Sequence, residues 1–311
     1  MFIPTFRDRK FILGGLLILD KYFDSRRELI NKALSKYLDS DSTKPEIIHR
    51  AMRYSVMAGG KRLRPTLMLA TYEMLANKRD KRSVQPVLPV ACAIEMLHTA
   101  SLIHDDLPFI DNADERRGKP SCHKKFGNAI AILAGDALMT KGFETVLKLR
   151  NSKKAIQCLE ELIDAASTRG MIGGQVVDIT SSQKRVKLHI LRDIHLKKTG
   201  ALLRSAERCA CILAGATEQI TNALSDFALN IGLAYQVIDD ILDEVGADDL
   251  LEKESGEDQR NEKVTYPTLL GIEESKRQAQ KLIQDAQNII KYIPNNNVLM
   301  DIVERIHDRI P

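Results

Sequence analysis

The sequence predicts an all-α protein that folds as one domain. Apolar residues recur with helical spacing along nearly the whole chain, and the alternating apolar and polar runs typical of strands, with their hairpin signals, are essentially missing. The 311 residues would permit two domains or one, and no linker rich in Pro, Ser or Gly divides them. We therefore expect a single helical domain over residues 1–311.

The expected helices follow one another from residue 45 onward. The segment 45–60 has a proline near its start and glycines at its end, as helix termini favour. Several later segments are apolar on more than one face, so we expect them inside a bundle, surrounded by other helices. These later helices are expected at 64–77, 87–106, 128–149, 154–174, 188–215, 220–246 and 275–293.

The composition favours a cytoplasmic protein without a nucleic-acid partner. The 46 basic residues nearly balance the 42 acidic ones, giving a net charge of +4, so any basic site must be local. The five cysteines are odd in number and form no CxxC pair, which argues against a disulfide framework or a zinc site. The apolar piece at 11–20 is too short to span a bilayer and no signal-peptide cleavage site follows it, so no transmembrane segment is expected.

The stretch DDLPFIDNADERRGKP, residues 105–120, follows an apolar helical run, although a run of mixed charge is often only a solvated surface loop. Asp105 and Asp111 are six residues apart, which on a regular helix would separate them by about 120°. Pro108 lies between them and cannot donate the helical hydrogen bond. We therefore expect the chain to bulge there, which would bring Asp111 back to Asp105.

A second acidic cluster, DDILDE at 239–244, lies inside an apolar helical run. Asp239 and Asp243 are four residues apart and would share a helix face about 40° wide, since each residue turns the helix by about 100°. A helix surface could tolerate this repulsion, but the neighbouring face is apolar. Carboxylates near a core need a compensating cation, and hard oxygen ligands suit Mg²⁺.

Three basic segments accompany the carboxylates: GGKRLRP at 59–65, Arg116–Arg117, and Lys197–Lys198–Thr199, which is expected just before a turn of small residues. GGKRLRP is not a P-loop, because Ser55 stands where the first glycine would be needed. Each segment alone is most simply a solvated pair of charges. Together with two clusters suited to magnesium, they indicate two anionic groups, one bridged by metal and one held directly by Arg and Lys.

The motifs GGKRLRP, HTASLIHDDLPFIDN, RRGKP, HLKKTGALL, YQVIDDILD and KVTYP occur in this order between Pro45 and Gly271. In this the chain resembles the trans-isoprenyl diphosphate synthase family. The four residues between the aspartates of the first motif are similar to those of geranylgeranyl and farnesyl diphosphate synthases of bacteria and plants. The resemblance implies an orthogonal helix bundle around a deep central cavity, usually a homodimer. It implies condensation of isopentenyl diphosphate with C5, C10 or C15 allylic diphosphates.

The resemblance also implies roles for individual residues. Asp105, Asp111 and Asp239 would hold Mg²⁺ on the allylic diphosphate, with Asp106 beside the first pair and Asp240 and Asp243 completing the second motif. The other matching positions would bind substrates. These are Arg116, Lys198, Lys253 and Lys263 for the allylic diphosphate, Lys61, Arg64, His98 and Arg117 for isopentenyl diphosphate, and Thr199 and Gln236 for the allylic cation.

Product length would depend on the depth of the cavity beneath the first motif. Ala100 and Ser101 are small, whereas farnesyl-forming bacterial relatives usually place an aromatic residue at the Ala100 position. This favours geranylgeranyl diphosphate (C20), with farnesyl diphosphate (C15) as the alternative. A non-catalytic partner subunit and a terpene cyclase are further alternatives, but the first typically loses a motif that is present here and the second normally lacks GGKRLRP.

Overall fold

The computed structural model describes residues 6–77, 82–181, 186–246 and 263–311, with side chains from residue 19 onward. The helices α1 (Phe6–Tyr37), α2 (Glu46–Val56), α3 (Leu63–Ala76), α4 (Leu88–Asp105), α5 (Cys122–Phe126) and α6 (Asn128–Val146) form the first half, with a 3₁₀ turn at Gln85–Val87. The second half contains α7 (Ser152–Ala166), α8 (Met171–Ser181), α9 (Leu188–His195), the π-helical turn η2 (Leu196–Gly200), α10 (Ala201–Ala214), α11 (Glu218–Val245), α13 (Tyr266–Leu270), α14 (Ile272–Ile290) and α15 (Asn297–His307).

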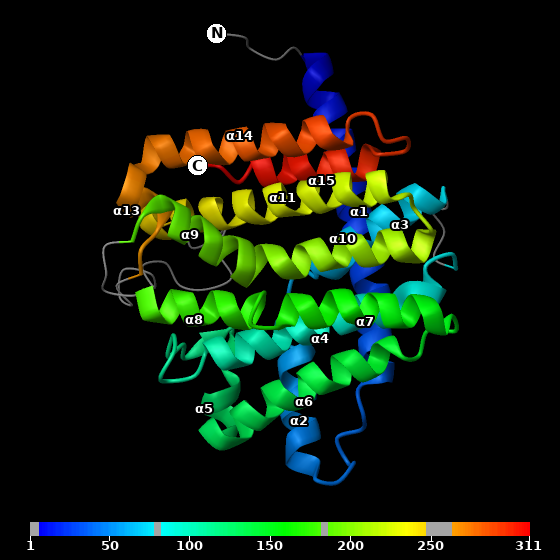
Figure 1. The fold of residues 1–311 in the computed structure, drawn as a ribbon, viewed down its shortest axis with the longest axis vertical. Helices are drawn as coiled ribbons and strands as arrows, with labels where there is room; N and C mark the ends of the chain where they lie inside the picture. The colour runs from blue at the N-terminus through cyan, green and yellow to red at the C-terminus, as the bar shows by residue number, and fades with distance from the viewer. Residues whose placement is uncertain (1–5, 78–81, 182–185, 247–262) are drawn as a thin grey trace.

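The all-α prediction is confirmed, and the helices cross at steep angles. In Figure 1, α14, α11, α10 and the α7–α8 pair lie across the view, whereas α1 and α2 run along the long axis. The described part of the chain contains one short hairpin that the sequence analysis did not expect, β1 (Glu115–Arg116) paired with β2 (Lys119–Pro120). Its turn residues Arg117 and Gly118 have φ of 57° and 69°, as a two-residue hairpin turn requires.

Two apolar clusters form the core, and helices α3 and α10 contribute to both. The first cluster joins these helices to α2, α4, α6 and α7, and the second joins them to α11, α14 and α15. Helix α4 lies in the first cluster. The stretch Gln85–Asp105 is long and apolar enough to cross a membrane, but 78% of its most apolar window is buried within the fold. Packing against neighbouring helices therefore accounts for its apolar sequence.

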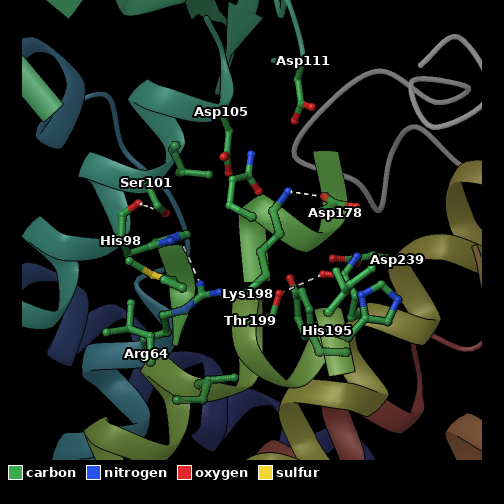
Figure 2. Close-up of a pocket in the computed structure, with 18 of the residues that line it drawn as sticks. Arg64, His98, Ser101, Asp105, Asp111, Asp178, His195, Lys198, Thr199 and Asp239 are labelled. Carbon is green, nitrogen blue, oxygen red and sulfur yellow. Dashed lines mark hydrogen bonds and ion pairs between the residues drawn. The ribbon is translucent and has the colours of Figure 1, made fainter. Parts of the chain in front are cut away.

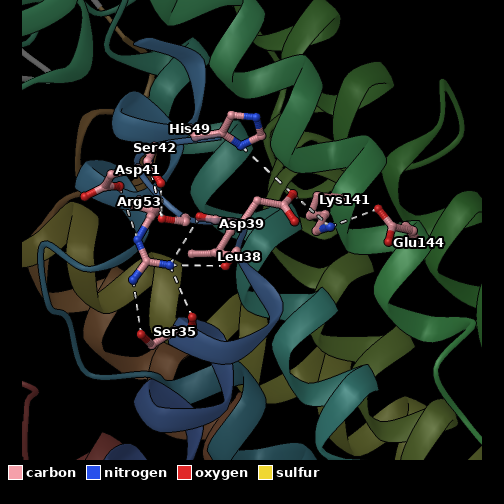
Figure 3. Close-up of polar contacts among 10 residues, drawn as sticks. Ser35, Leu38, Asp39, Asp41, Ser42, His49, Arg53, Lys141 and Glu144 are labelled. Atoms are coloured by element: carbon pink, nitrogen blue, oxygen red, sulfur yellow. Dashed lines mark hydrogen bonds and ion pairs between the residues drawn. The ribbon is translucent and has the colours of Figure 1, made fainter. Parts of the chain in front are cut away.

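Three helices meet at a polar junction that Figure 3 shows. Arg53 of α2 donates to the carbonyls of Ser35 and Leu38, each at 3.2 Å, and thereby satisfies acceptors that the end of α1 leaves open. Lys141 of α6 pairs with Asp39 at 3.1 Å. These contacts fix the ends of α1 and α2 against α6, next to the cluster that contains α4.

One expected helix and one expected turn differ from the observed structure. The run 154–174 is broken at Ser167, whose hydroxyl donates to the Asp164 carbonyl at 2.8 Å and accepts from the Arg169 amide at 3.1 Å, forming a turn between α7 and α8. The expected turn after Lys197–Thr199 was wrong. The chain instead continues through the π-helical turn η2 directly into α10. Helices α1 and α15 were not anticipated.

Candidate active site

A cavity of about 320 Å³ lies where α3, α4, α8, η2, α10 and α11 meet. It is lined by most of the residues singled out from the sequence, including Asp105, Asp111, Lys198 and Asp239. In Figure 2, Asp105 and Asp111 lie near one another at the top of the view, with Lys198 and Asp239 below them. The carboxylates of the two motifs thus reach the cavity from the end of α4 with the turn that follows it, and from the C-terminal part of α11.

The first acidic motif closes back on itself, as predicted. Helix α4 ends at Asp105, and the chain then turns so that the Asp111 amide donates to the Asp105 carbonyl at 2.9 Å. Pro108 lies within that turn. Asp111 also pairs with Lys263 at 2.8 Å. Burial raises the pKa of Asp105, with Asp111 adding to this and Lys198 opposing it.

Asp106 faces away from the cavity. It is only 2% exposed, and it accepts a charge-assisted bond from Arg116 at 2.5 Å. Arg116 itself lines the cavity. Asp106 therefore orients Arg116 and is not itself presented to a metal or substrate.

The members of the second motif divide between two environments. Asp239 lines the cavity and pairs with Arg309 at 2.7 Å. Burial raises its pKa to about 6, although Arg309 lowers it in part. Asp240 also borders the cavity, whereas Asp243 is buried in the helix packing and does not line it.

Lys198 is the central cation of the site. It pairs with Asp178 at 2.8 Å. Burial lowers the pKa of Lys198, but the carboxylates of Asp105, Asp178 and Asp111 outweigh this and raise it. Lys198 is therefore a permanent positive charge between the two acidic motifs. The π-helical turn presents it to the cavity together with Thr199.

Thr199 and Gln236 form a polar pair on one wall. The Thr199 hydroxyl donates to Gln236 Oε1 at 3.2 Å, and Gln236 Nε2 donates to Asp240 at 3.1 Å. Both residues line the cavity. Their predicted role toward an allylic cation stays a prediction.

Three basic side chains and one histidine of the predicted isopentenyl site also face the cavity. Lys61, Arg64, Arg117 and His98 all line it. His98 Nε2 lies 3.2 Å from Arg64 Nη1 and must accept, because arginine has no acceptor. Burial and the surrounding arginines hold the pKa of His98 well below its usual range, so the neutral ring carries its proton on Nδ1. Nδ1 is then the donor that His98 can offer to an anion.

Both glycines of GGKRLRP have a positive φ, and Gly60 also lies against Arg117. The φ of Gly60 is +108°, and a Cβ there would lie 2.5 Å from the Arg117 guanidinium carbon. Arg117 also donates to the Gly59 carbonyl at 2.6 Å. Gly60 thus lets Arg117 pack directly against the turn between α2 and α3.

The predicted chain-length residues lie in different surroundings. Ser101 lines the cavity, as does Met139 of α6, whereas Ala100 is fully buried and does not line it. The predicted substrate residue Lys253 lies outside the described residues.

The residues that line the cavity and that sequence reasoning missed include Gln175, Asp178, His195 and Arg309. Asp178 and Gln175 follow the glycine pair of α8, and His195 begins the recognised HLKKTG motif, so spacing could have indicated them. Arg309, whose guanidinium also lies 4.3 Å from the centre of the Tyr235 ring, is remote in sequence from every motif. No local pattern could have found it.

The carboxylate oxygens of this site suit magnesium in a particular way. Among the described residues, no group of three or more His, Cys, Asp or Glu side chains is close enough to hold a metal ion. Mg²⁺ is commonly bound by one or two carboxylates together with substrate phosphate oxygens and water. Asp105 with Asp111, and Asp239 apart from them, fit that mode, in which the substrate supplies the remaining ligands.

The comparisons with known proteins agree on a family. The polyprenyl synthetase family model matches residues 45–297. The chain is 40% identical over 293 residues to a geranylgeranyl diphosphate synthase of Cyanophora paradoxa, covering 93% of this chain and 95% of that protein. It is 40% identical over 279 residues to a farnesyl diphosphate synthase of Geobacillus stearothermophilus, covering 88% and 92%. A solved FPP/GFPP synthase from Zymomonas mobilis superposes with a TM-score of 0.80 at 31% identity, covering 95% and 99%.

The resemblance drawn from the motifs is thereby confirmed. The relatives carry names for products of different length, so they support prenyl transfer without deciding how long the product is. The chain belongs to the polyprenyl synthetase family of trans-prenyltransferases.

Proposed function

We propose that the protein condenses isopentenyl diphosphate head-to-tail with allylic diphosphates and releases geranylgeranyl diphosphate (C20). The observation that carries this proposal is one cavity lined by two sets of groups that suit anions. Asp105, Asp111 and Asp239 with Lys198 form the first set, and Lys61, Arg64, His98 and Arg117 form the second. A condensation of two diphosphates needs both sets.

The chain's own residues suit ionisation of the allylic substrate. Lys198 and Arg116 would bind the allylic diphosphate as direct cations. Mg²⁺, held by Asp105, Asp111 and Asp239, would neutralise the leaving diphosphate. The oxygens of Thr199 and Gln236 would face the positive charge that develops on the allylic carbon. Lys61, Arg64, Arg117 and the His98 Nδ1 donor would fix isopentenyl diphosphate, whose double bond then attacks the allylic carbon. The departing diphosphate would take the proton that the product loses.

The C20 product is favoured by the small side chain at the cavity wall. Ser101 lines the cavity beneath the first motif, where an aromatic ring would shorten it. The C15 product is the second candidate, because a named farnesyl diphosphate synthase is as similar to the chain as a named geranylgeranyl diphosphate synthase. Met139, which also lines the cavity, is the residue that could limit its depth.

We also propose that the protein is a cytoplasmic homodimer. Large apolar side chains lie exposed on one face of each of three successive helices, α6, α7 and α8. Neighbouring helices in this series contact one another, so the side chains can form one surface. We call this set the apolar strip: Ile132, Leu133, Ile156, Ile163, Ile172, Val176 and Ile179, each between 37% and 55% exposed. A second copy of the chain would cover it.

One assay tests the activity and the product length. The purified protein is incubated with Mg²⁺, labelled isopentenyl diphosphate and each of the C5, C10 and C15 allylic diphosphates, and product lengths are resolved. We expect C20 from all three allylic partners. Products no longer than C15 would support the farnesyl alternative, and no product at all would support a non-catalytic partner subunit. Cyclic hydrocarbon formed without isopentenyl diphosphate would indicate a terpene cyclase.

Asp105→Ala and Asp239→Ala provide the matched test of the two motifs. Each removes one carboxylate from the cavity, so we expect turnover to fall by several orders of magnitude, a loss on the order of several kcal/mol of transition-state stabilisation. Circular dichroism should show the helical fold retained. Asp114→Ala, on an exposed carboxylate of the same loop, is the control. Near wild-type turnover in either motif variant would contradict the proposed use of the carboxylates.

A further inference from the structure

Asp240 of the second acidic motif is held by three hydrogen-bond donors from three separate segments. Its Oδ2 accepts from the backbone amide of Tyr266 at 3.1 Å and lies 3.3 Å from His195 Nε2, and its Oδ1 accepts from Gln236 Nε2 at 3.1 Å. The side chain is 2% exposed. Both carboxylate oxygens are therefore engaged by protein donors, and Asp240 serves a different purpose from Asp239.

His195 has a defined tautomer in this arrangement. A carboxylate only accepts hydrogen bonds, so His195 Nε2 must carry the proton that it shares with Asp240. The imidazole also stacks on the Tyr266 ring, with ring centres 5.7 Å apart and 17° between the planes. His195 ends α9, one turn before Lys198 and Thr199. The ring is thus fixed in position on both its edge and its face.

Asp240 in turn decides which way the Gln236 amide points. The amide nitrogen must face Asp240, since two acceptors would otherwise repel each other. The amide oxygen is thereby directed to Thr199, whose hydroxyl donates to it. Without a fixed acceptor at Asp240, the amide could turn over and present its NH₂ group to the cavity. A partial positive charge there would oppose an allylic cation.

We propose that His195 is a positioning residue that, through Asp240, keeps the oxygen of Gln236 turned toward the developing allylic cation. This inference rests on the proposed prenyl transfer. His195 acts without contacting either diphosphate, by holding the acceptor that orients the amide. Its contribution therefore appears when the allylic carbon becomes charged and is small while the substrates are only bound.

The test replaces His195 in two ways. His195→Leu removes the donor, whereas His195→Gln keeps an amide N–H that can reach Asp240. For His195→Leu we expect kcat to fall by about ten- to a hundredfold. This is at most the lower end of the loss seen when one preorganised polar group is removed directly, because His195 acts only through Asp240. The KM for isopentenyl diphosphate should change less than about threefold. His195→Gln should recover most of that loss. His189→Leu, on an exposed histidine of the same helix α9, is the matched control.

A readout that does not depend on turnover separates positioning from folding. The rise in melting temperature on adding Mg²⁺ and inorganic pyrophosphate should be equal in the wild type and in His195→Leu, because the diphosphate site is unchanged. An unchanged kcat, loss of the pyrophosphate-induced rise, or failure of His195→Gln to recover activity would each overturn the role. A wild-type protein that makes no prenyl product would instead overturn the proposed function.

Discussion

At the residue scale, Glu207 on α10 is a carboxyl group sealed inside the fold and held neutral. It is 0% exposed and accepts a hydrogen bond from the Thr71 hydroxyl. Its other oxygen, Oε1, has no hydrogen-bond partner among the described residues. Burial raises the pKa of Glu207 to about 8, although the Thr71 bond lowers it in part. Between the unfolded and the folded pKa values, the folded protein therefore keeps a proton on Glu207 that the unfolded chain would release.

This raised pKa predicts how stability depends on pH. The unfolded carboxyl loses its proton near 4.5 and the folded one near 8, so between these values the folded state binds more protons and stability falls as pH rises. The contribution is complete below the unfolded pKa and is lost as pH rises through the folded one. The slope from this one group is about 1.4 kcal/mol per pH unit. We expect Glu207→Gln to remove it.

Urea denaturation of the wild type and of Glu207→Gln at pH 6 and pH 8 measures the effect. The exposed Glu304→Gln on α15 is the control and should keep the wild-type difference between the two pH values. If the free energy of unfolding changed equally between pH 6 and pH 8 in the wild type and in Glu207→Gln, this carboxyl would not be the titrating group.

At the element scale, the contact between α8 and the π-helical turn η2 sets the position of Lys198. Gly174 of α8 lies against the backbone of η2. A Cβ at this position would be 2.5 Å from the backbone nitrogen of Lys198 and 2.8 Å from the Lys197 Cβ. Backbone cannot move aside as a flexible side chain can. The glycine is thus required by a close approach of two helical segments.

Gly174→Ala should therefore displace η2 and with it the Lys198 ammonium group. Overpacking of this kind typically costs about 1–3 kcal/mol of stability. We expect the KM for the allylic diphosphate to rise more than the KM for isopentenyl diphosphate, since Lys61 and Arg64 lie on another element. Gly142→Ala on α6 is the control, because its Cβ would meet neighbours only at 3.3 Å or more. If Gly142→Ala raised the KM for the allylic diphosphate as much as Gly174→Ala, the contact between α8 and η2 would have no special role.

At the scale of the whole molecule, the depth of the cavity should control product length. Ser101 lines the cavity and Ala100 lies behind it in the packed core. Ser101→Tyr would place a ring across the cavity, where close-packed helices leave little room to relax. We expect the longest product to shift from C20 to C15, with the C5 and C10 allylic substrates still consumed. An unchanged product distribution would place the floor elsewhere, with Met139 as the next residue to vary.

The apolar strip predicts an oligomeric state. Ile163→Glu with Val176→Glu would place charges on two helices of the strip, and a second copy could then cover it only by burying unpaired carboxylates. We expect light scattering to report a dimer for the wild type and a monomer for the double variant. Tyr292→Glu, at a residue that is 83% exposed away from the strip, should remain dimeric. A monomeric wild type would overturn the proposal.

The sequence by itself determined the helical class, the two aspartate motifs and the closure of the first motif. These features depend on periodicity, on Pro108 and on residue types within short segments, which local physics controls. It also indicated Lys198, Thr199 and Gln236 as neighbours of the carboxylates, because Lys198 and Thr199 occur in HLKKTGALL and Gln236 occurs in YQVIDDILD beside the second acidic cluster.

Only the tertiary structure decided the surroundings of each carboxylate in the two motifs. Asp106 turns to Arg116, Asp240 borders the cavity but is held by His195 and Tyr266, and Asp243 is buried, although all three stand in the same motifs as Asp105 and Asp239. Their partners lie 10, 45 and 26 residues away, and Arg309 reaches Asp239 across 70 residues. Contacts over such separations depend on how helices pack, and no local pattern of residues records that packing.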